Sequence, residues 1–106
     1  GGFVCHRLVH DPVIAPRLSG VLFMGSFPDD GFAASAPVKR GTPVFIGHGS
    51  NDKTSPLATM EAFAAKLRAT AGASNVMIHR FNTGSHGTPI RMTDWRLVLN
   101  WMFSRG

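Results

Sequence analysis

Two polar segments of this chain carry residue types that could do acid-base chemistry. GHGSNDKTSP, Gly47 to Pro56, contains Asp52, and TGSHGTP, Thr83 to Pro89, contains His86. A histidine can take a proton from a weak nucleophile such as a serine hydroxyl and return it to the leaving group. A carboxylate can hold the imidazole in the required tautomer and stabilise it once it is protonated. Asp52 and His86 are therefore a candidate acid and base.

Each of these residues follows a run that predicts a buried strand. Thr42 to Ile46 is a short apolar run before Asp52, and Val76 to Phe81 precedes the turn residues Asn82 to Gly87 around His86. The carboxyl ends of parallel strands meet at one edge of a sheet, where open α/β sheets place their ligands. We therefore expect Asp52 and His86 to lie at the same edge.

The segment between the two strands predicts a helix. Ser55 is a candidate N-cap, Pro56 suits the first helical position, and Gly72 is a stop signal. Apolar residues return on one face of this helix at Leu57, Met60, Phe63 and Leu67. The resulting order is strand, acid, helix, strand, histidine.

The rest of the chain predicts two more helices and one more strand. The first helix runs from Val4 to about His10, where Asp11-Pro12 ends it, and Ser19 to Gly25 is an apolar strand. A loop rich in Pro, Gly, Ala and Ser follows, from Ser26 to Gly41. The last helix is expected to begin near Thr93 or Asp94 and to bury Trp95, Val98, Leu99 and Met102.

This order, with the motifs HGSND and GSHGTP, resembles the C-terminal half of an α/β-hydrolase. These motifs are most similar to those of esterases of the polyhydroxybutyrate-depolymerase and dienelactone-hydrolase-like branches. The resemblance covers essentially all 106 residues. It implies an α/β class with a three-layer α/β/α hydrolase fold, in which residues 1–106 form a single partial domain from the C-terminal part of a mostly parallel sheet. It also implies a Ser-His-Asp triad with Asp52 as the acid and His86 as the histidine.

The resemblance places the nucleophile upstream. The nucleophile elbow of this superfamily reads G-x-S-x-G, and Gly1-Gly2 matches its end, so the serine and part of the oxyanion hole would precede Gly1. Ser50 and Ser85 lack the flanking glycines of an elbow. We therefore expect a fragment that does not turn over substrate alone and that is poorly soluble without the missing N-terminal half, because its apolar first strand lacks a neighbour.

Several assignments stay open at this stage. Asp29 or Asp30 could supply the acid in place of Asp52, while Asp52 could simply favour a helix start and His86 could cap a loop. His48 is expected to support the acid loop. No metal site is expected from His48, Asp52, His79 and His86, because no histidine pair among them has helical ligand spacing and His79 lies inside a strand.

Composition limits the function classes. The charge of +5 is spread along the chain, which does not favour a nucleic-acid surface, and no apolar run reaches the length of a membrane span. The single Cys5 cannot form a disulfide within the chain. The expected function is hydrolysis of a small-molecule or polymeric carboxylic ester, without a cofactor. The alternatives are a non-catalytic small α/β binding or structural module and a peptidase of the same superfamily; localisation is left open.

Overall fold

The computed structural model of the chain describes residues 2–25, 38–54 and 56–105, with the side chains of residues 6–25, 38–54 and 56–104. Its helices and strands are α1 (Gly2–His10), β1 (Val21–Met24), β2 (Val44–Gly49), α2 (Leu57–Ala71), β3 (Val76–Phe81), α3 (Thr88–Met92) and α4 (Trp95–Arg105). Two short 3-10 turns, at Ala15–Arg17 and Ala73–Asn75, precede β1 and β3. The chain therefore belongs to the α/β class.

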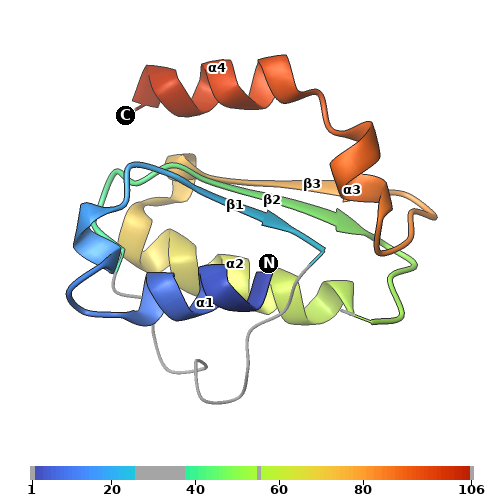
Figure 1. The fold of residues 1–106 in the computed structure, drawn as a ribbon, viewed down its shortest axis with the longest axis horizontal. Coiled ribbons are helices and arrows are strands. Elements are labelled where there is room, and N and C mark those ends of the chain that lie inside the picture. Colours follow the sequence, from blue (N-terminus) through green and yellow to red (C-terminus); the bar gives the residue numbers. More distant parts are fainter. Residues whose placement is uncertain (1, 26–37, 55, 106) are drawn as a thin grey trace.

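The three strands form one parallel sheet with β2 in the centre. Val44 of β2 is in register with Val21 of β1 on one side and with Val76 of β3 on the other. Every residue of β2 is buried, which is what a central parallel strand requires and what its apolar sequence predicts. Because the strands run the same way, they end at one edge of the sheet, where the loops after β2 and β3 also lie, on the right of Figure 1.

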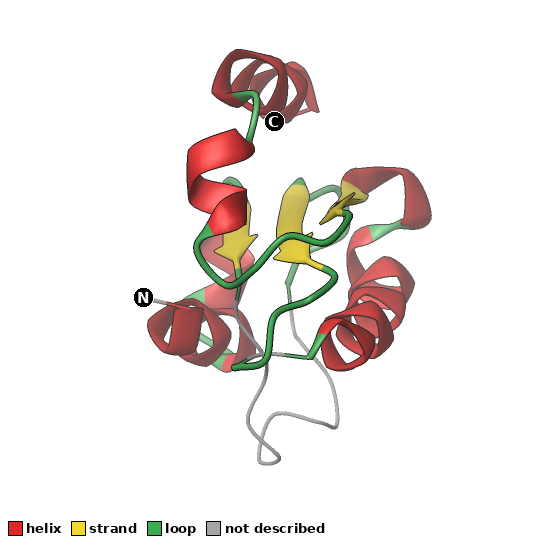
Figure 2. Ribbon diagram, turned by 90° about the vertical axis from the view of Figure 1, so that its right-hand side faces the viewer, coloured by secondary structure: helices red, strands yellow, loops and turns green. Residues whose placement is uncertain are grey.

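Helices cover both faces of the sheet. Figures 1 and 2 show α1 and α2 beneath the strands and α4 above them, with α3 descending from α4 to the edge where the strands end. Side chains alternate along a strand, so Val44 and Ile46 face α2 while Phe45 faces α4.

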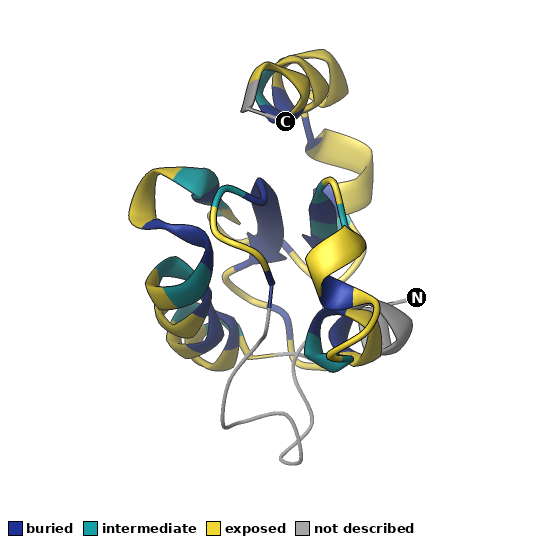
Figure 3. Cartoon of the chain, turned by 90° about the vertical axis from the view of Figure 1, so that its left-hand side faces the viewer, coloured by how far each residue is buried: buried dark blue, intermediate teal, exposed yellow. Residues whose placement is uncertain are grey.

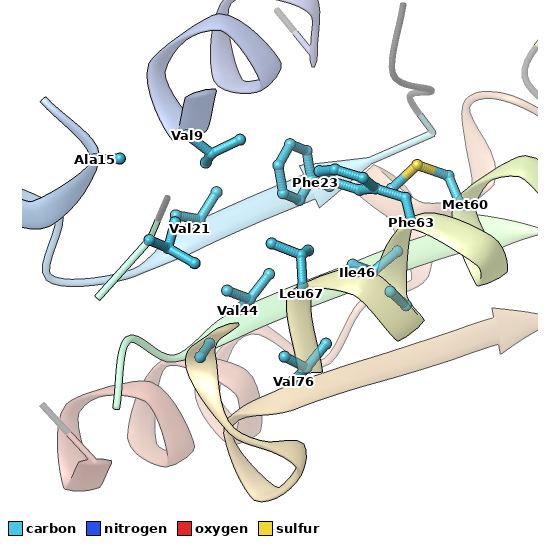
Figure 4. Close-up of a cluster of buried hydrophobic side chains, with 13 residues drawn as sticks. Val9, Ala15, Val21, Phe23, Val44, Ile46, Met60, Phe63, Leu67 and Val76 are labelled. Carbon is cyan, nitrogen blue, oxygen red and sulfur yellow. The ribbon is translucent and has the colours of Figure 1, made fainter. Parts of the chain in front are cut away.

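The two faces carry apolar layers of different size. The larger layer lies between the sheet and the helices α1 and α2; Figure 4 shows Phe23, Phe63 and Leu67 meeting there. On the other face, Val98 and Met102 of α4 pack on Phe45. Figure 3 shows the buried strands between helices whose outer surfaces are exposed.

Several predicted bounds are confirmed. β3 has the predicted limits, and α2 ends before Gly72, whose φ of 103° suits a glycine. Pro56 occupies the N-cap position of α2 rather than the first helical position, and the predicted cap Ser55 lies outside the described residues.

Other bounds were predicted wrongly. β1 is shorter than the predicted Ser19 to Gly25, and β2 runs past Ile46 to Gly49 because its end pairs with His79–Phe81 of β3. The loop that contains Asp29 and Asp30 lies almost entirely outside the described residues.

The last helix differs from its prediction in two ways. It begins at Trp95 after Asp94, whose Oδ1 accepts the Leu97 N–H at 3.1 Å, so the predicted start is confirmed as a cap. Trp95 and Leu99, however, are exposed, because the stripe that meets the sheet is centred on Val98 and Met102. No helix in the described part of the chain is both long and apolar enough to cross a bilayer.

Candidate functional site

Asp52 occupies the tight turn between β2 and α2. Its backbone N–H donates to Gly49 O (3.2 Å), and its Oδ1 accepts the backbone N–H of Thr54 (2.9 Å). The carboxyl group is 0% exposed. An aspartate commonly folds back on its own turn in this way, and the contact fixes the side chain while using only one of its two oxygens.

The second oxygen of Asp52 bonds His86. Oδ2 lies 2.8 Å from Nδ1 of His86, which follows β3 in the loop before α3. An ionised carboxylate only accepts hydrogen bonds, so Nδ1 carries the proton and Nε2 of the neutral ring is the acceptor nitrogen. The imidazole is 53% exposed, in contrast to its partner. A buried carboxylate thus orients a half-exposed imidazole.

Backbone contacts hold the two loops together. Asn51 N–H donates to Gly84 O (2.9 Å), and Ser50 N–H donates to Phe81 O (3.0 Å). Gly49 approaches Gly84 so closely that a Cβ on Gly49 would lie 2.3 Å from Gly84 O. Glycine is required for this approach, and it brings the histidine loop over the acid loop.

The end of β1 reaches the same place through Gly25. This residue has a φ of +60°, and its N–H donates to Gly47 O at 3.0 Å. A Cβ at Gly25 would lie 2.8 Å from His86 O and 3.5 Å from Oδ2 of Asp52. The sequence analysis did not single out Gly25; the only signal was a glycine at the end of an apolar strand.

The His86 loop is closed by α3, which the sequence analysis missed. Thr88 Oγ1 accepts the Ser85 N–H at 2.9 Å, and Thr93 Oγ1 donates to Pro89 O at the other end of the helix. Pro89 and Thr93 are buried, so α3 anchors the loop on the sheet edge.

His48 lies beside Asp52, as expected. His79 lies elsewhere, on the exposed surface of β3. His48 is fully buried in β2, with Nε2 3.7 Å from Asp52 Oδ2. His79 is exposed on β3 and stacks on Phe81, with ring centroids 4.5 Å apart. Within the described residues, no three His, Cys, Asp or Glu side chains are grouped so as to hold a metal ion.

Ser50 and Ser85, the two serines of these loops that the structure describes and the sequence analysis considered, have other partners. Ser50 Oγ accepts the Thr83 N–H at 2.8 Å, and Ser85 Oγ lies 3.3 Å from Thr88 Oγ1. Both contacts stabilise the loops that carry Asp52 and His86. Asp29 and Asp30, the alternative acids, lie outside the described residues.

Comparison with known protein families and with curated proteins gives no match to this chain.

Proposed function

We propose that this chain contributes the acid and the base of a serine hydrolase that cleaves carboxylic esters, on the C-terminal half of an α/β-hydrolase fold. One observation carries the proposal: a fully buried Asp52 carboxylate lies 2.8 Å from Nδ1 of a half-exposed His86 at the carboxyl edge of a parallel sheet. A triad requires this combination of a sheltered acid and an accessible base.

In the proposed reaction, His86 moves the protons. Its Nε2 takes the proton of a serine hydroxyl while that oxygen attacks the ester carbonyl carbon, and the imidazolium then gives the proton to the departing alcohol. Water, deprotonated by the same nitrogen, hydrolyses the acyl-enzyme and restores the serine. Asp52 stays ionised and stabilises the imidazolium in both halves of the reaction.

The serine in this proposal lies upstream of the present sequence. Ser50 and Ser85 support backbone and side-chain contacts of the two loops, and neither has the glycine pattern of an elbow. The oxyanion hole would come from the same upstream segment.

The purely structural explanations account for the geometry less well. An aspartate that only favoured the start of α2 would use its contact with the Thr54 N–H. That contact is made by Oδ1 and does not account for the approach of Oδ2 to His86. A histidine that only capped a loop would bond backbone groups. Nδ1 of His86 instead contacts the carboxylate of Asp52, which lies in the loop after a different strand.

The test is an esterase assay on the chain expressed with its contiguous upstream coding sequence. We expect hydrolysis of p-nitrophenyl acetate or butyrate, and a loss of about 100-fold or more in kcat for His86→Ala, because positioned base catalysis contributes about 10² to 10⁴. His79→Ala is the matched control, since it removes an exposed histidine from the strand before the site.

A fluorophosphonate that labels activated serines should mark one upstream serine, and mass spectrometry of the labelled peptide would locate it. Equal rates for wild type and His86→Ala would reject the esterase and favour the non-catalytic module. Activity on peptides alone would favour the peptidase, which uses the same machinery with a different pocket.

A further inference from the structure

Two imidazoles lie close to Oδ2 of Asp52. His86 Nδ1 approaches it at 2.8 Å from the exposed side, and His48 Nε2 approaches it at 3.7 Å from within the sheet. The side chains of both Asp52 and His48 are fully buried. The proposed reaction uses only the first of these rings.

His48 differs from the other two residues in lying on a strand of the sheet. It belongs to β2, where its backbone is in register with Arg80 of β3, whereas Asp52 and His86 are on loops. Strand alternation puts it on the face of Val44 and Ile46, at the end of the apolar layer beneath the sheet. A strand residue therefore places a buried polar ring 3.7 Å from a buried carboxylate oxygen.

We propose that His48 is a positioning residue for the Asp52–His86 pair: its ring fixes the Asp52 carboxylate in the orientation that bonds His86. The proposal rests on the function proposed above and adds a third residue to it.

The physical argument starts from the cost of burying a charge. A carboxylate in an apolar environment is strongly disfavoured unless polar groups surround it. The Thr54 N–H bonds Oδ1, and Oδ2 bonds His86 Nδ1 and lies 3.7 Å from Nε2 of the buried His48 ring. A hydrocarbon side chain at residue 48 would make this orientation unfavourable, and the carboxylate would turn away from His86.

A displaced Asp52 carboxylate should lower kcat rather than change KM. The contact between Asp52 and His86 strengthens when the imidazole becomes charged, so a displaced carboxylate loses stabilisation mainly in the transition state. Displacements of about 1 Å can cost about 100-fold in rate.

The experiment uses the full-length protein with His48→Leu, His48→Gln and the control Ile46→Val. Ile46 is a buried neighbour on the same face of β2, so its variant reproduces a packing defect without touching the acid. The readouts are kcat and KM on p-nitrophenyl butyrate and the low-field proton NMR signal of the His86 Nδ1–H, which Asp52→Asn identifies by removing it.

For His48→Leu we expect kcat to fall about 10- to 100-fold at an unchanged KM, together with a shifted or broadened His86 signal. His48→Gln keeps a polar group at the position and should recover most of both. Ile46→Val should change neither.

Failure of this proposal differs from failure of the proposed function. If the wild type hydrolyses no ester, the NMR signal still tests His48, because it reports the hydrogen bond itself. An unchanged signal and kcat in His48→Leu, with only a lower melting temperature, would show that His48 merely packs and would overturn the proposal.

Discussion

The two carboxylate oxygens of Asp52 have separate tasks. Oδ1 closes the turn before α2 through Thr54, and Oδ2 is directed to His86. The turn contact determines where the side chain lies, so the orientation of the histidine depends on a local backbone feature of the acid loop.

Gly25 offers a test of how tightly this pair is packed. Gly25→Ala should lower kcat/KM by about 10- to 100-fold, because the new Cβ would displace His86, whose backbone oxygen would lie 2.8 Å away. The positive φ adds a conformational cost of about 1–2 kcal/mol. Esterase kinetics and thermal melting of the full-length protein measure the two effects.

The control for this substitution is Gly41→Ala. Gly41 also has a positive φ, of 95°, but a Cβ there would meet nothing within 4 Å. The Gly41→Ala protein should therefore lose stability but keep its esterase activity. Equal activity losses in the two variants would mean that backbone strain, rather than contact with His86, is responsible.

The sequence predicted the position of Asp52 and His86 for a simple reason. Each follows a strand, and parallel strands end at one edge, so order alone brings the two residues together. The contribution of Gly25 could not be foreseen, because it depends on the packing of the β1 end against a loop far along the chain.

At the scale of single elements, His6 fixes α1 to the sheet. Its buried ring stacks on Phe23 of β1 (centroids 4.5 Å apart) and meets the edge of Phe63 of α2 (4.9 Å). Burial, together with the neighbouring His10, lowers the pKa of His6 from 6.5 to about 4. The residue is therefore neutral in the folded protein at neutral pH.

This contact should make the protein acid-sensitive. Below pH 6.5 the unfolded chain takes up a proton at His6 that the folded chain refuses, so stability falls as the pH drops and stops falling near pH 4. The full loss is about 3 kcal/mol. Unfolding curves at pH 7 and pH 4.5 measure most of this loss. His6→Phe should make the free energy of unfolding less dependent on pH. His79→Ala, which removes an exposed histidine, should leave this pH dependence unchanged. The same pH dependence in wild type and both variants would contradict the role of His6.

The attachment of α4 depends on few side chains. Val98, 1% exposed, packs with Met102 on Phe45, so Val98→Ala should destabilise the protein by about 2 kcal/mol at about 0.8 kcal/mol for each buried carbon removed. Leu97→Ala, on the same helix but 59% exposed, should change stability by less than about 0.5 kcal/mol. Thermal or urea unfolding compares them, and equal losses would show that α4 does not pack as described.

The elements differ in how well their sequences predict them. β3 starts with three apolar residues and ends at a cluster of turn residues, and α2 has a full apolar stripe, so both were found. α3 spans only Thr88–Met92, which is too short for a periodic signal, and its Gly-Thr-Pro start reads as a turn. The burial of α4 was overestimated because the pattern shows apolar residues without showing how much sheet is present to cover them.

At the scale of the whole molecule, apolar side chains remain exposed on the C-terminal helices. They belong to α3 and α4 and are Ile90, Met92, Trp95, Leu97, Leu99 and Phe103. β1 also pairs with β2 alone, so one edge of this strand has no partner strand in the described sheet. Figure 3 shows how much of α4 is exposed. Surfaces and edges of this kind favour association.

The 106-residue chain expressed alone should therefore associate, and removing exposed apolar groups should reduce the association. Leu97→Lys with Phe103→Lys replaces two side chains that are 59% and 77% exposed, so it should shift sedimentation toward the monomer without weakening the core. Asn100→Lys with Ser104→Lys adds the same charge to α4 while keeping its apolar surface. If that control variant improves solubility equally, charge repulsion is the cause. A wild-type chain that is monomeric and melts cooperatively would contradict the prediction, because the exposed surface would then need no partner.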